Sequence, residues 1–177
     1  MPGLKVPKHF DNLLKSLPAI LSGAQRDRFG LRQVFLSTLV FHIMQQVGRA
    51  FEEKSDGGTD DLGHSFAPLH RKTIAKKSTP SFRAKHPTLG FPEQIMRASG
   101  KLLLSLSEGE LIEGQYYPPR NQVVEFANSI LRIYSKLPYA VYQAKKRPFV
   151  AEDISPWVDE ALKKALEAVG RKLGTLR

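Results

Sequence analysis

The chain has 177 residues and no cysteine, and it carries a formal net charge of +10 at pH 7. This length suits one domain, and the absence of cysteine excludes disulfides and thiolate metal sites. The most apolar stretch, residues 34–44, is too short and too polar to span a membrane, so we expect no membrane contact. The positive charge favours an acidic partner, such as nucleic acid or an acidic protein, or else it marks a solvated basic surface.

Residues 1–30 are interpreted as an N-terminal extension that precedes a single domain over residues 31–177. A short apolar pattern in the extension is interrupted by Pro18, which predicts a brief or kinked helix. Apolar side chains at helical spacing then predict a long helix over residues 31–54. The acidic stretch at residues 56–61 lacks the ligand spacing of an EF-hand, so we interpret it as a solvated turn rather than a calcium site.

Residues 66–94 include the most basic part of the chain. The prolines, glycine and hydroxyl residues of positions 78–94 predict a long extended loop. Phe66 and Leu69, which precede the cations, are expected to anchor the fold. The cations that follow are expected to face a partner, although a solvated loop is the alternative; they are Arg71, Lys72, Lys76, Lys77 and Arg83.

The second half of the domain is predicted to hold the strands and a final helix. Gly100 is expected to join a helical turn to a strand within residues 95–106. Alternating apolar residues predict an antiparallel hairpin between residues 110–117 and 122–128, and residues 129–143 fit either a strand or a short helix. Ser155 as the N-cap and Pro156 as the first helical residue predict a C-terminal helix. Trp157 is expected to pack this helix on the sheet.

These elements predict an α+β fold, in which a long N-terminal helix and a C-terminal helix pack on a small antiparallel β-sheet beside a long basic loop. No motif in the chain predicts catalysis. The residues around Gly100 and Lys101 lack the flanking glycine and hydroxyl residue that a phosphate-binding loop requires. His64 and His70 lie near two aspartates but lack the spacing of a zinc motif. We therefore expect no catalytic residue, no metal, no cofactor and no enzyme activity.

Two segments, residues 66–77 and 139–149, mix aromatic residues, prolines and cations, a composition that suits contact with another protein. Together with the helix that ends near Phe51, their order along the chain resembles the virion morphogenesis, or tail-completion, proteins of tailed phages, typified by the G protein of phage Mu. The residues that carry this resemblance are Asp56-Gly57-Gly58, Phe66 to Leu69 with Thr73 and Lys77, Ala98-Ser99-Gly100-Lys101-Leu102, and Tyr139-Ala140, Gln143 and Arg147-Pro148-Phe149.

The resemblance implies a structural protein of the virion neck or tail end, a tail terminator or head–tail joining protein that assembles in the host cytoplasm as a hexameric ring. Its implied partners are other neck and tail proteins, such as the connector, tail tube or sheath, with non-specific contact with genomic DNA as a further expectation. Most of the positive charge is expected to face protein partners. A basic nucleic-acid-binding module is the alternative function.

Residues 145–149 are the preferred subunit contacts, together with the five cations above. The alternative is that Arg147 pairs locally and Phe149 covers the domain's own core. The full set of candidate contacts is therefore Lys145, Lys146, Arg147, Pro148, Phe149, Arg71, Lys72, Lys76, Lys77 and Arg83. The expected fold anchors are Phe66, Leu69, Gly100, Tyr139 and Trp157.

Overall fold

A computed structural model describes residue 19 and residues 30–86, 92–95, 101–127, 130–148 and 153–175. The helix expected within residues 1–30 lies outside this part of the chain, as do Gly100 and Phe149. The elements follow the order α2 (Leu31–Ser55), α3 (Arg71–Lys77), α4 (Pro80–Lys85), α5 (Lys101–Leu106), β1 (Glu110–Ile112), β2 (Gln115–Tyr117), β3 (Gln122–Ala127), β4 (Ile130–Ser135), α6 (Ala140–Lys146) and α7 (Ser155–Gly174). The α+β class predicted from the sequence is confirmed.

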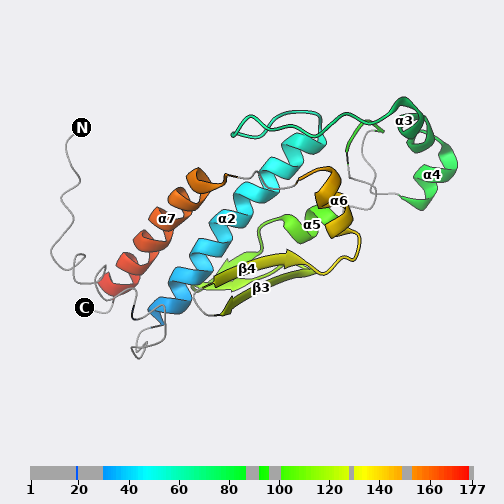
Figure 1. The fold of residues 1–177 in the computed structure, drawn as a ribbon. Helices are drawn as coiled ribbons and strands as arrows, with labels where there is room; N and C mark the ends of the chain where they lie inside the picture. Colours follow the sequence, from blue (N-terminus) through cyan, green and yellow to red (C-terminus); the bar gives the residue numbers. More distant parts are fainter. Residues whose placement is uncertain are drawn as a thin grey trace.

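Helix α2 is the central element, with α7 beside it and the hairpins on its other side (Figure 1). Its 25 residues make it about 37 Å long. Phe35, near its start, is buried with Ala165 and Val169 of α7. Phe51, near its end, belongs to a second core cluster that continues under α5 and α6. Because apolar residues occupy more than one side of α2, the helix can hold both layers together.

Helix α7 packs chiefly on α2, and its N-terminus differs from the prediction by one residue. Ser155 is the first helical residue rather than the cap, and its N–H donates to the Asp153 carboxylate at 2.9 Å. Hydrogen bonds from Ser155 hold the pKa of Asp153 below its usual value. Trp157 is buried in the core cluster against which Val124 and Leu131 of the sheet also pack, and its indole N–H donates to Asp61, in the turn after α2, at 2.9 Å.

The strands form two separate two-stranded sheets, so the predicted pairing of residues 110–117 with residues 122–128 is wrong. Strand β1 pairs with β2, and β3 pairs with β4. Glu113 and Gly114 both have positive φ, 51° and 78°, as in the two-residue turns that close tight hairpins. Residues 110–117 therefore fold back on themselves.

Two further predictions are corrected by short helices. The strand expected within residues 95–106 is helix α5, whose buried residues, Leu102, Ser105 and Leu106, recur at helical spacing. The long loop expected over residues 78–94 contains helix α4. Thr79 caps α4 by accepting the Phe82 N–H, and Pro80 takes an early helical position, where its missing N–H does no harm.

The turn after α2 is built around a buried ion pair, so its interpretation as a solvated turn is wrong for Asp60. The Lys54 ammonium lies 3.0 Å from the Asp60 carboxylate, and the two side chains are 2% and 0% exposed. Asp60 also accepts the N–H groups of Leu62 and His64. Burial opposes the ionisation of Asp60, but the His64 hydrogen bond and the Lys54 charge outweigh it and lower the pKa of Asp60.

Replacing Lys54 by methionine should leave the buried Asp60 carboxylate without its charged partner. We expect Lys54→Met to lower the free energy of unfolding by about 3–5 kcal/mol, the range seen when one partner of a buried pair is removed. Urea denaturation, monitored by circular dichroism, measures this free energy of unfolding. Lys163→Met, on the exposed side of α7, is the matched control and should change stability by less than about 0.5 kcal/mol. Equal effects of the two substitutions would contradict the role of the pair.

The lowered pKa of Asp60 predicts a pH dependence. An unfolded aspartate has a pKa of about 3.9, so the stabilisation from Asp60 is complete above this value and is lost as the pH falls through the lower folded pKa. Urea unfolding between pH 2 and pH 6 should show a smaller acid loss of stability in Asp60→Asn than in the unsubstituted protein. If the two proteins lost stability equally as the pH falls, the lowered pKa of Asp60 would be contradicted.

Candidate functional site

The two segments singled out from the sequence meet in the structure. The Arg147 guanidinium approaches the Ala67 carbonyl oxygen, with Nε and Nη2 each at 3.4 Å. Phe66, next to Ala67, is 5% exposed and lies edge-on to Phe51, with the ring centroids 5.8 Å apart. Leu69 packs against the same core cluster. The end of α6 is therefore held to the chain that leaves the turn after α2.

The inner face of helix α6 carries small residues, and its outer face carries large ones. Ala140 is buried, and Ala144, one turn later, packs against the core. On the outside, Val141 is 65% exposed and Tyr142 is 57% exposed. The Lys146 ammonium lies 4.7 Å from the centroid of the Tyr142 ring, a cation–π contact. The outer surface, here named the α6 surface, consists of Tyr139, Val141, Tyr142, Lys145 and Lys146.

The candidate contacts of the second segment divide into exposed and engaged residues. Lys145, Lys146 and Pro148 are exposed. Arg147 is half-buried and contacts Ala67, which agrees with the alternative of local pairing. Tyr139 does not anchor the fold through its side chain, which is 41% exposed because the residue lies at the solvent side of the start of α6.

The cations of the first segment lie on α3 and α4, which form an arm at the end of the molecule (Figure 1). Arg71, Lys72, Lys76 and Arg83 are exposed there. Lys77 is not a surface cation: it is 6% exposed, and its ammonium donates to the Gln94 carbonyl. Burial lowers the pKa of Lys77. Lys77 thus fastens the arm to the chain that returns from it.

Sequence reasoning did not select Val141 and Tyr142 as interface residues. A signal was present, because Ala140 and Ala144 are small residues one helical turn apart and mark the buried side of a short helix. The large residues between them must then point outward. The sequence fits both a strand and a helix at residues 129–143, and only the helix α6 over Ala140–Lys146 makes this spacing informative.

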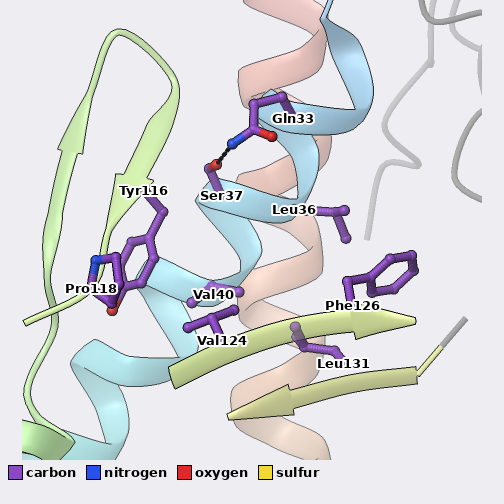
Figure 2. A pocket seen from close by; sticks show the side chains of 9 residues that line it. All are labelled: Gln33, Leu36, Ser37, Val40, Tyr116, Pro118, Val124, Phe126 and Leu131. Atoms are coloured by element: carbon purple, nitrogen blue, oxygen red, sulfur yellow. Dashed lines mark hydrogen bonds between the residues drawn. The ribbon is translucent and has the colours of Figure 1, made fainter. Parts of the chain in front are cut away.

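A hollow of about 250 Å³ lies between the first half of α2 and the hairpins (Figure 2). Its walls are mostly apolar, with Leu36 and Val40 from α2 facing Val124 and Leu131 of the sheet. Tyr116 is the titratable side chain among the described lining residues. Its hydroxyl donates to Gln122 at 2.6 Å and accepts the Gly109 N–H at 3.1 Å. The hollow therefore suits an apolar side chain better than a reaction that transfers protons.

The Gln122 amide links the hairpin side of this hollow to the end of α5. It donates to the carbonyl oxygens of Ser105 and Ser107 at 3.2 Å and 3.1 Å, while its oxygen accepts the Tyr116 hydroxyl. Gly109 must lack a side chain, because a Cβ atom there would lie 2.0 Å from the Tyr117 carbonyl oxygen. The side of the hollow that the hairpins form is thus tightly packed.

Burial raises the pKa of Tyr116 to about 12. Absorbance titration at 295 nm should therefore contain a component near this value, and Tyr116→Phe should remove it. Because an unfolded tyrosine titrates near about 10, the stabilisation from the neutral hydroxyl is complete below that pH and is lost as the pH rises towards the folded pKa. An unchanged titration curve in Tyr116→Phe would contradict this environment.

No protein-family model, curated protein or solved structure matches this chain. In the described parts of the chain, no three histidine or acidic side chains gather as a metal site would require. No helix in those parts is both long and apolar enough to cross a bilayer.

Proposed function

We propose that this protein is a structural component of a tailed-phage virion, a tail-completion or head–tail joining protein that forms a ring at the neck. The observation that carries the proposal is the α6 surface. It presents large apolar side chains to solvent, while its inner face packs on the core and Arg147 at its end contacts the Ala67 carbonyl. Exposed aromatic residues on a rigid support are the usual anchors of protein interfaces. The order of motifs that resembles the tail-completion family supports the same class.

A ring requires two different patches on each subunit, one of which meets the other on the next copy. The α6 surface lies near the end of α2 that holds Phe51, whereas the apolar hollow adjoins residues 33–40 at the other end. About fourteen residues of helix, or about 20 Å, separate these positions along α2. This separation suits head-to-tail association, with the hollow available to receive an apolar side chain from the next subunit.

Native mass spectrometry tests the proposal, with a hexamer expected for the unsubstituted chain. We expect Val141→Ser with Tyr142→Ser to abolish the ring, since loss of one interface anchor costs about 2 kcal/mol or more, a roughly 30-fold change in Kd. The matched control is Ile112→Ser with Tyr117→Ser, because these residues are similarly exposed, at 50% and 46%, on the first hairpin. A chain that stays monomeric, or rings that survive the α6 substitutions, would overturn it.

A further inference from the structure

We propose that the arm formed by residues 70–86, here named the basic arm, binds the phosphate backbone of duplex DNA without reading its sequence. This surface is separate from the α6 surface, and the inference does not depend on ring formation. It also changes the expectation that most of the positive charge faces protein partners.

The charge of the basic arm is not balanced within its own segment. Between Asp61 and Glu93 the sequence contains no aspartate or glutamate, although it contains six lysines and arginines. This segment therefore carries +6 of the formal net charge of +10. A stretch of cations without interspersed carboxylates produces a local positive field that attracts a polyanion.

The structure concentrates these cations on one small projection. Arg71, Lys72 and Lys76 are exposed on α3, and Arg83 and Lys85 are exposed on α4, which contacts α3. Helix α3 has seven residues and is about 10 Å long. Duplex DNA carries one negative charge per about 1.7 Å of its axis, so the basic arm can face several phosphates at once.

Local hydrogen bonds give the basic arm a defined shape. His70 Nδ1 accepts the Lys72 N–H and so caps α3. The Ser78 and Thr79 hydroxyls donate to carbonyl oxygens at the end of α3. Because these polar side chains are used to hold the two helices, the cations are displayed on a preformed support and lose less freedom on binding.

The chemistry of the basic arm favours nucleic acid over an acidic protein. Among residues 70–86, all of which the structure describes, no large apolar side chain is exposed. The centre of a protein–protein interface is enriched in aromatic residues and depleted of lysine, whereas protein–DNA interfaces are polar and strongly positive. The α6 surface exposes two tyrosines and a valine beside its lysines, whereas the basic arm exposes cations without a large apolar side chain among them.

Fluorescence anisotropy with a labelled 30-base-pair duplex, measured across salt concentrations with the full chain, tests the inference. The variant carries Arg71→Ala, Lys72→Ala and Lys76→Ala. Each phosphate contact contributes about 0.9 to the slope of log K against log salt, so the slope should fall by up to about 2.7. Affinity at 50 mM salt should fall by about tenfold or more. Duplexes of unrelated sequence should bind equally.

The matched control removes the same charge from α7, with Lys163→Ala, Lys164→Ala and Lys172→Ala, and it should keep most of the affinity and slope. Thermal unfolding of both variants establishes that each is folded. The inference is wrong if the unsubstituted chain does not bind DNA at 50 mM salt, or if both variants lose affinity equally. It is also wrong if poly-glutamate displaces the duplex as effectively as unlabelled DNA, because the basic arm would then recognise acidic proteins. None of these results depends on whether the chain forms a ring.

Discussion

The buried pair of Lys54 and Asp60 is the interaction on which the arrangement of both surfaces depends. It joins the last turn of α2 to the loop that follows, and Asp60 also binds two backbone N–H groups of that loop. The Lys54 ammonium lies 5.6 Å from the centroid of the Phe66 ring. A buried charge is tolerated only when it is paired and hydrogen-bonded. The chain is therefore reversed at a defined point and enters the core at Phe66.

From this turn the structure separates two kinds of surface. The neighbouring Asp61 binds Trp157 and so attaches α7 to the same turn, while Ala67 contacts Arg147 and supports α6. The α6 surface, with its exposed tyrosines, is thereby attached to the core. The basic arm begins a few residues later and is fastened by Lys77 to the Gln94 carbonyl. A surface with exposed tyrosines beside a projecting cationic arm fits a protein that joins a protein partner and a polyanion, the combination proposed above.

The long helices were predictable because helical hydrogen bonds and side-chain spacing are local in the chain. The apolar periodicity of residues 31–54 located both ends of α2, and the Pro156 signal located the start of α7, each to within one residue. Strand pairing is not local, and the hairpin prediction failed because Glu113 and Gly114 form a tight turn that was not recognised. Helix α5 was mistaken for a strand because a short run of leucines fits both periods.

The residue types of both surfaces could be read from the order of amino acids: aromatic residues and cations cluster near residues 139–149, and cations without carboxylates cluster after residue 66. Their exposure could not be read in this way. Only the folded chain buries Lys77 and Asp60, exposes Tyr139 and brings Arg147 to Ala67. Local composition determines which chemistry a segment carries. Burial depends on what distant segments pack against it, and so the tertiary structure decides which of those side chains a partner can reach.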